Sequence, residues 1–150
     1  MHCPGCCNKE LQELKPNYIV SLEELVGIIK EAKERFDIEG VTLSGGEPSL
    51  QKGLLQLNQE IKRLGLGIIM FSGKQKDVLD KGLVSSVDLL IDGPFVQELL
   101  DEQRVLIGSK NKRLCFITER YRPCAQYFDN PVAIEEVALS EDGYIFVNGD

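Results

Sequence analysis

Short apolar segments alternate with segments of helical period over the first two thirds of the chain. Ser21 and Glu24 form a capping box, which predicts a helix that begins after Ser21 and ends near Phe36. Further helices are predicted over about 50–64 and 75–81, and buried strands over 41–43, 66–71 and 87–91. Alternation of this kind builds βαβ units around a parallel sheet, so the sequence predicts an α/β fold.

The first two predicted helices each carry one apolar face. Their apolar residues recur three or four positions apart, which places them on one side of a helix. We expect both faces to belong to the core: Leu22, Leu25, Ile29, Ala32 and Phe36 in the first helix, and Leu50, Leu54, Leu57, Ile61 and Leu64 in the second.

Polar, glycine-containing segments follow the three predicted strands. They are Ser44–Pro48, Ser72–Gly73 and Asp92–Pro94. Ligands of parallel sheets bind outside the carboxyl ends of the strands, where such segments meet. The pattern therefore predicts a ligand site at one rim of the sheet.

The last third of the sequence has a different character. A strand is predicted over Leu114–Thr118, irregular structure over Glu119–Pro131, and a β-hairpin with its turn at Asp142-Gly143. We find no internal repeat and no long linker, so the 150 residues are predicted to form one domain, with a core over 1–113 and an extension over 114–150.

Composition excludes several classes of protein. No apolar run approaches the ~20 residues of a membrane span, and the first residues lack the pattern of a signal peptide, so we expect a cytoplasmic protein. The net charge of −7 and scattered basic residues argue against nucleic acid as a partner. Lys110–Arg113, near Arg104, is either a site for one anionic group or a solvated turn.

Three of the five cysteines lie within five residues, at Cys3, Cys6 and Cys7. A C-x-x-C pair such as Cys3 and Cys6 can hold one edge of a metal site or form a redox-active disulfide. The odd number of cysteines argues against a disulfide framework. Cys115, in an apolar strand, is interpreted as a small buried hydrophobe, and Cys124 lies in a loop beside Pro123.

Four motifs together resemble one family. Gly45-Gly46-Glu47-Pro48, between a strand and a helix, resembles the GGEP signature of the radical S-adenosylmethionine superfamily. Cys3–Asn8, Asp92–Phe95 and Gly108–Asn111 resemble the C-P-G-C-x-N, D-G-x-F and G-S-x-N runs of the anaerobic ribonucleotide reductase activating proteins. The motifs occur in that family's order, and the resemblance covers roughly residues 1 to 115.

The resemblance implies an incomplete (β/α) barrel of parallel strands that lacks its first strand. It implies a 4Fe-4S cluster held by Cys3 and Cys6, and S-adenosylmethionine as cofactor. The implied cofactor-binding residues are Gly45, Gly46, Glu47, Pro48, Ser72, Asp92, Ser109 and Asn111. The implied activity is installation of a glycyl radical on a partner such as anaerobic ribonucleotide reductase, with electrons from a flavodoxin or ferredoxin.

The sequence departs from the family at the cluster motif. The first of three cysteines should lie four residues before Cys3, and Cys7 stands where the family has an aromatic residue. We therefore expect the chain, as printed, to lack a stable cluster and to be inactive. Three alternatives stay open: a cluster-less scaffold relative, a small radical enzyme that modifies peptides, and a thiol–disulfide protein that uses Cys3 and Cys6.

Overall fold

A mixed four-stranded sheet is the centre of the computed structural model, which describes residues 19–104, 106–129, 136–139 and 145–148. Its strands are β1 (Gly40–Leu43), β2 (Gly67–Phe71), β3 (Leu89–Asp92) and β4 (Arg113–Phe116), in the spatial order β1-β2-β3-β4. Strands β1, β2 and β3 are parallel. The α/β class is confirmed.

Strand β4 runs antiparallel to β3, so the expectation of parallel strands is wrong at this edge. Parallel neighbours need a crossover connection, usually a helix. Between β3 and β4 the described residues contain only the short 3-10 turn Gln97–Leu99, and the chain returns along the same rim. The sheet is open over the described residues, and the incomplete barrel stays a prediction.

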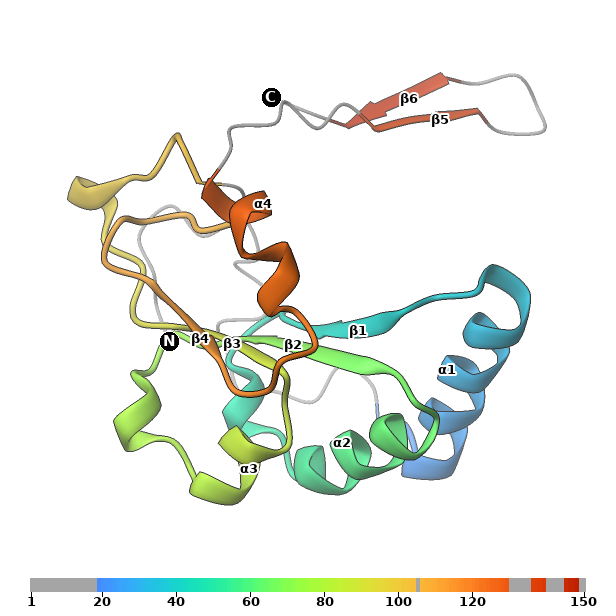
Figure 1. The fold of residues 1–150 in the computed structure, drawn as a ribbon. Helices are drawn as coiled ribbons and strands as arrows, with labels where there is room; N and C mark the ends of the chain where they lie inside the picture. Colours follow the sequence, from blue (N-terminus) through green and yellow to red (C-terminus); the bar gives the residue numbers. More distant parts are fainter. Residues whose placement is uncertain (1–18, 105, 130–135, 140–144, 149–150) are drawn as a thin grey trace.

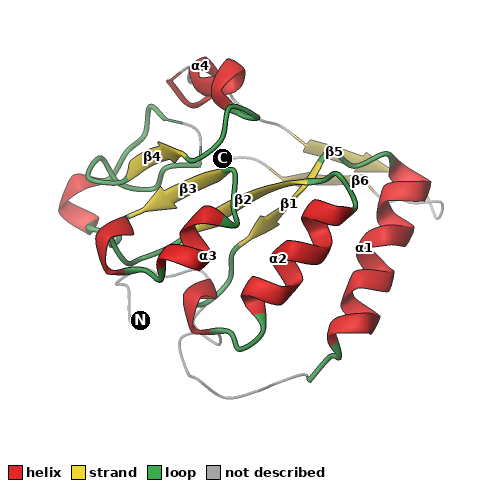
Figure 2. Cartoon of the chain, turned by 60° about the horizontal axis from the view of Figure 1, so that its bottom comes forward, coloured by secondary structure: helices red, strands yellow, loops and turns green. Residues whose placement is uncertain are grey.

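Three helices cover one face of the sheet: α1 (Leu22–Phe36), α2 (Leu54–Arg63) and α3 (Lys81–Ser85) (Figures 1 and 2). Buried Ile29, Leu54 and Ile61 from the helices pack against side chains of the sheet. The sheet contributes Ile68, Met70 and Leu90 to this cluster, all of them 0% exposed. We call this side of the sheet the helix face.

Helix α1 has the limits that its capping box predicts. The Ser21 side chain accepts a hydrogen bond of 3.1 Å from the amide of Glu24, and Asp37 ends the helix in the left-handed conformation. Its apolar stripe is only partly core, because Leu22 is 41% and Phe36 70% exposed. The expectation of a fully buried stripe is wrong at these two residues.

The other two helices begin later than predicted. Pro48–Leu50 form a 3-10 turn, and α2 starts only after Gly53, whose positive φ of 82° breaks the helical path; Leu50 is consequently 41% exposed. In place of a helix over 75–81, a 3-10 turn spans Lys76–Val78, and α3 follows Asp80. The Asp80 carboxylate caps α3 by accepting a hydrogen bond of 2.8 Å from the amide of Leu83.

The opposite face of the sheet is covered by part of the connection between β3 and β4 and by the segment that follows β4. Leu89 and Ile91 of β3 pack there with Ile107 and Phe128. Phe128 lies in α4 (Ala125–Asp129), a short helix in a stretch that was predicted to be irregular (Figure 1). We call this side the α4 face.

Strands β5 (Glu136–Leu139) and β6 (Ile145–Asn148) pair antiparallel, as the predicted hairpin requires. Asp142-Gly143 lies outside the described residues, so the hairpin turn stays a prediction. Among the helices that the structure describes, none has the length and apolar character to cross a membrane.

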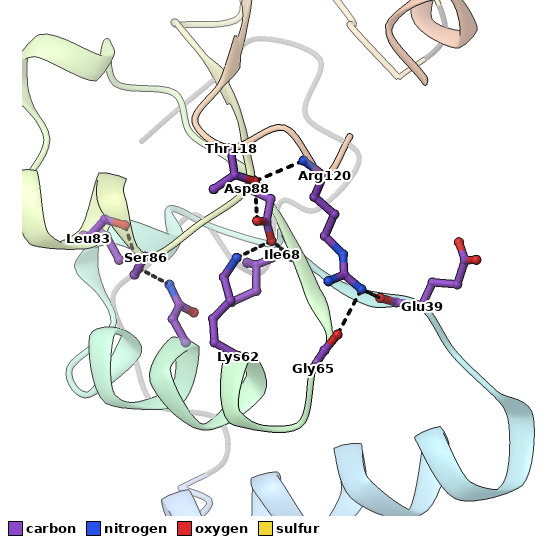
Figure 3. Close-up of polar contacts among 10 residues, drawn as sticks. Glu39, Lys62, Gly65, Ile68, Leu83, Ser86, Asp88, Thr118 and Arg120 are labelled. Carbon is purple, nitrogen blue, oxygen red and sulfur yellow. Dashed lines mark hydrogen bonds and ion pairs between the residues drawn. The ribbon is translucent and has the colours of Figure 1, made fainter. Parts of the chain in front are cut away.

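A buried ionic cluster lies at the end of the sheet where the parallel strands begin (Figure 3). The Asp88 carboxylate accepts hydrogen bonds from the Ile68 amide at 2.8 Å and the Thr118 hydroxyl at 2.6 Å, and it pairs with Lys62. Burial alone would raise the pKa of Asp88, but these hydrogen bonds and the charge of Lys62 lower it. This cluster joins α2, β2, the start of β3 and the segment after β4 at the end of the sheet opposite the predicted ligand site.

Candidate functional site

The loops after β1, β2 and β3 lie side by side at the carboxyl ends of the strands. A hydrogen bond between Ser72 and Glu47 joins the first two loops. The amide of Gly93 donates to the carbonyl of Lys74 at 3.1 Å and joins the second loop to the third. We call this edge the carboxyl rim.

Glu47 is the main link between the first two loops. Its side chain is 7% exposed, and its two oxygens accept three hydrogen bonds. The Ser72 hydroxyl donates to Oε1 at 2.8 Å and the Gly73 amide to Oε2 at 2.8 Å, while the Ser49 amide donates to Oε1 at 3.2 Å. With its lone pairs used in this way, the carboxylate fixes the loop that contains it.

Gly45 and Gly46 precede this link. Gly45 has a φ of 114°, a conformation that favours glycine, and Pro48 begins the 3-10 turn directly after Glu47. Among the described residues, no hydrogen bond engages the backbone of Gly45 or Gly46. Their peptide groups are therefore free, within this part of the chain, to bind a polar ligand.

Ser72 is 2% exposed, and both its hydroxyl and its amide form hydrogen bonds. Its hydroxyl donates to Glu47 and accepts a hydrogen bond of 3.0 Å from the Lys74 amide, and its own amide donates to the Ile91 carbonyl at 2.9 Å. The residue therefore shapes the loop after β2 through its hydroxyl group.

Asp92 ends β3 and is 0% exposed. Its carboxylate accepts hydrogen bonds from Arg113 Nε at 2.9 Å, from Arg113 Nη2, and from the Lys76 amide at 2.5 Å. Burial opposes ionisation, but the hydrogen bonds from Arg113 and Lys76, with the charges of Arg113 and Lys112, lower the pKa of Asp92. Sequence reasoning missed this partner, because the pair exists only through the antiparallel register of β3 and β4.

Ser109 and Asn111 lie against the loop after β3. The buried Ser109 hydroxyl accepts a hydrogen bond of 3.4 Å from the Val96 amide, and Asn111 Nδ2 donates to the Pro94 carbonyl at 2.8 Å. Asn111 Oδ1 is buried and has no hydrogen-bond partner among the described residues. Both residues thus contact the loop after β3, at Pro94 and Val96, and within the described residues neither forms a hydrogen bond with Gly45–Pro48.

The basic cluster is largely used inside the protein. Arg104 pairs with Asp101 at 2.6 Å and donates to the Lys110 carbonyl at 3.0 Å. Lys112 Nζ donates to the Gly93 carbonyl at 2.8 Å. Hydrogen bonds from Arg104 lower the pKa of Asp101 to about 2. These contacts stabilise the turn before β4, and the two interpretations of this cluster stay predictions.

The cysteines expected to hold a cluster, Cys3 and Cys6, lie outside the described residues, as does Cys7. Of the other two, Cys124 is exposed, and Cys115 is half-buried with its sulfur 3.9 Å from Asp92 Oδ1. Burial raises the pKa of Cys115, which makes it a poor thiolate ligand. No group of three or more potential metal ligands occurs among the described residues, so Cys3 and Cys6 remain the candidate donors.

A cavity of about 410 Å³ adjoins the loop after β1. Ser44, Gly46 and Glu47 line one side of it, and apolar residues at the starts of α1 and α2 line the other. Gly46 is therefore accessible from this side.

The chain is similar to a family of iron–sulfur proteins and to several activating proteins. Residues 1–115 match the family described as a 4Fe-4S single cluster domain. The anaerobic ribonucleoside-triphosphate reductase-activating protein of Salmonella typhimurium is 31% identical over 119 residues, which cover 73% of this chain and 77% of the relative. That of Haemophilus influenzae is 31% identical over 121 residues, with the same coverage.

A shorter similarity extends to a second kind of enzyme. A probable GTP 3′,8-cyclase of Saccharolobus islandicus is 42% identical over 59 residues, which cover 39% of this chain and 18% of that protein. No solved structure matches the chain.

Proposed function

The chain belongs to the 4Fe-4S single cluster domain family and to the radical S-adenosylmethionine activating enzymes, and on this premise we propose that it installs a glycyl radical on a partner enzyme. The relatives with this similarity over most of the chain are named as activators of anaerobic ribonucleoside-triphosphate reductase. That reductase is therefore the proposed partner. A flavodoxin or ferredoxin is the proposed electron donor.

The cofactors would be held at two places. Cys3 and Cys6 would ligate the cluster through their thiolates, and the backbone of Gly45 and Gly46 would bind the ammonium group of S-adenosylmethionine. When bound and reduced by one electron from the donor, the cluster and S-adenosylmethionine would supply the radical chemistry that removes a hydrogen atom from a glycine of the partner.

One observation supports this site most strongly. The buried Glu47 carboxylate binds Ser72 and the Gly73 amide, and so holds the Gly45-Gly46 turn against the next loop without occupying the glycine backbone itself. A site fixed before its ligand arrives avoids the cost of ordering a loop on binding. The carbonyl oxygens of the glycine pair can accept hydrogen bonds from the ammonium group of the ligand.

The other predicted site residues are proposed to shape this rim. Ser72 and Asp92 anchor the loops after β2 and β3, and Ser109 and Asn111 support the loop after β3. Pro48 sets the start of the turn after Glu47. The single-domain organisation and the cytoplasmic location remain predictions.

Calorimetry with S-adenosylmethionine tests the proposed site. We expect Glu47→Ala to weaken binding, because the Gly45-Gly46 turn loses its anchor. Glu31→Gln is the matched control, because Glu31 pairs with Arg35 on the exposed surface of α1 and forms no hydrogen bond with the carboxyl rim within the described residues. Equal affinities in the Glu47→Ala variant and the parent chain would remove the support for this site.

A further inference from the structure

Arg113 holds the buried end of β3 from the neighbouring strand. Resting on the proposed function, we propose that Arg113 is a positioning residue for the S-adenosylmethionine site. It acts through Asp92, whose carboxylate it keeps ionised and in place, and thereby fixes the loops after β2 and β3 at the carboxyl rim.

The pair is built by the register of two strands. Asp92 and Arg113 are directly opposite each other in the antiparallel β3–β4 ladder. Arg113 donates to both carboxylate oxygens, from Nε to Oδ1 at 2.9 Å and from Nη2 to Oδ2. Such two-pronged pairing of a guanidinium with a carboxylate fixes orientation as well as charge.

The same carboxylate reaches a third element. The Lys76 amide, at the start of the 3-10 turn after β2, donates to Asp92 Oδ2 at 2.5 Å. Next to it, the Gly93 amide donates to the Lys74 carbonyl at 3.1 Å. Loss of Arg113 would therefore release the loop after β2 as well as the end of β3.

Asp92 itself is turned away from the α4 face. Successive side chains of a strand point to opposite faces, and Leu90 of β3 packs in the core of the helix face, whereas Leu89 and Ile91 pack on the α4 face. Asp92 shares the orientation of Leu90 and is 0% exposed. We infer that Asp92 anchors the rim and that the ligand contacts the backbone that Asp92 holds.

The charged surroundings decide how the pair responds to pH. Arg113 and Lys112 favour the ionised form of Asp92, and Lys76 faces the neighbouring Cys115 thiol. Asp77 adds a negative charge near Arg113. The side chain of Asp92 is 0% exposed, whereas that of Arg113 is 50% exposed. Removal of Arg113 therefore leaves a buried carboxylate without its main cationic partner, and the pKa of Asp92 must rise.

The test compares Arg113→Gln and Arg113→Lys with the parent chain. Arg35→Gln is the matched control, since Arg35 forms an exposed pair with Glu31 on α1. Hydrogen exchange of the Lys76 amide reports the anchor without any ligand. Calorimetry with S-adenosylhomocysteine between pH 4 and 8 reports the ligand site without a cluster.

We expect Arg113→Gln to accelerate exchange of the Lys76 amide and to weaken the ligand by roughly tenfold or more at pH 7, because the loops are displaced. Its affinity should fall further on the acid side, where Asp92 becomes protonated, while that of the parent chain stays level. Arg113→Lys should recover part of both effects, because it keeps the charge and one donor. Arg35→Gln should change neither.

Unchanged Lys76 exchange in both Arg113 variants would overturn the proposal, as would an affinity and pH profile equal to those of the parent chain. If Arg113→Gln does not fold, Arg113→Lys alone decides through the same two measurements. Absence of any ligand binding by the parent chain would contradict the proposed function, whereas the Lys76 exchange would still decide whether Arg113 anchors the rim.

Discussion

Ser72 and Glu47, which are 25 residues apart in the sequence, share a hydrogen bond of 2.8 Å between buried side chains at the carboxyl rim. Each belongs to the loop that follows a parallel strand, so this single bond joins the ends of β1 and β2. The Gly73 amide adds a second link to the same carboxylate at 2.8 Å. The rim thus has a defined geometry before any ligand binds.

Removal of Glu47 should destabilise the protein more than removal of the Ser72 hydroxyl. Glu47→Ala leaves the Ser72 hydroxyl and two amides without their acceptor and should cost about 2–3 kcal/mol, whereas Ser72→Ala should cost about 1 kcal/mol. The double variant should be less unstable than the sum, because both changes remove the same bond. Urea unfolding of the four proteins measures this, and strictly additive losses would show that the bond contributes nothing.

Two glycines should respond to alanine in opposite ways. A Cβ at Gly67 of β2 would overlap Tyr121 on the α4 face, so Gly67→Ala should cost about 1–3 kcal/mol. Gly27 lies inside α1 with nothing within 4 Å of an added Cβ, so Gly27→Ala should stabilise by about 0.5–1 kcal/mol. Thermal unfolding compares the two, and a Gly67→Ala protein as stable as the parent would contradict the packing of Tyr121.

The Asp88 cluster should make stability depend on acid pH. The pKa of Asp88 in the folded protein is lowered, so its contribution is complete above the pKa of the unfolded chain, about 4, and is lost as the pH falls through the folded value. Asp88→Asn strands the Lys62 charge and should cost about 3 kcal/mol at pH 7.

The loss should shrink at lower pH, and the unfolding free energy of Asp88→Asn should fall less steeply below pH 4 than that of the parent. Glu34→Gln, on the exposed surface of α1, provides the control and should change stability by less than about 0.5 kcal/mol. Parallel curves for Asp88→Asn and the parent between pH 5 and 2 would count against the ionised cluster.

Iron binding should depend on the amino-terminal cysteines alone. After anaerobic reconstitution of a form extended upstream by a cysteine four residues before Cys3, Cys3→Ala and Cys6→Ala should reduce iron and sulfide per chain, because thiolates are the cluster ligands. Cys124→Ala should leave both unchanged, since Cys124 is exposed and belongs to no ligand group among the described residues. Loss of iron in Cys124→Ala with full retention in Cys3→Ala would reverse the assignment.

Local patterns predicted much of the fold. The capping box of α1, the three parallel strands and the polar loops at their ends all follow from residue periodicity and turn chemistry, which act over short distances. The late start of α2 did not follow from the apolar stripe, because the left-handed Gly53 and the 3-10 turn at Pro48 override helical spacing. The direction of β4 depends on how a long connection returns, which no local pattern encodes.

The site was predictable to the same extent. Glycine and acidic residues at the strand ends indicated the rim, but the side chains that bind them could not be predicted from the sequence. The pairing of Asp92 with Arg113 and of Glu47 with Ser72 requires the register between strands, which only the tertiary structure supplies. Phe36, which the helical period assigned to the core, lies instead at the surface beneath the Arg35 guanidinium.

The most direct measurement is electron paramagnetic resonance of anaerobic ribonucleotide reductase after anaerobic incubation with the reconstituted activator, S-adenosylmethionine and reduced flavodoxin. The activator is tested as printed and with an upstream extension that carries a cysteine four residues before Cys3. We predict a glycyl-radical doublet on the reductase with the extended form, and its loss in the extended Cys3→Ala variant. An extended form that holds a complete cluster and cleaves S-adenosylmethionine, yet produces no doublet on the reductase, would contradict the proposed activity.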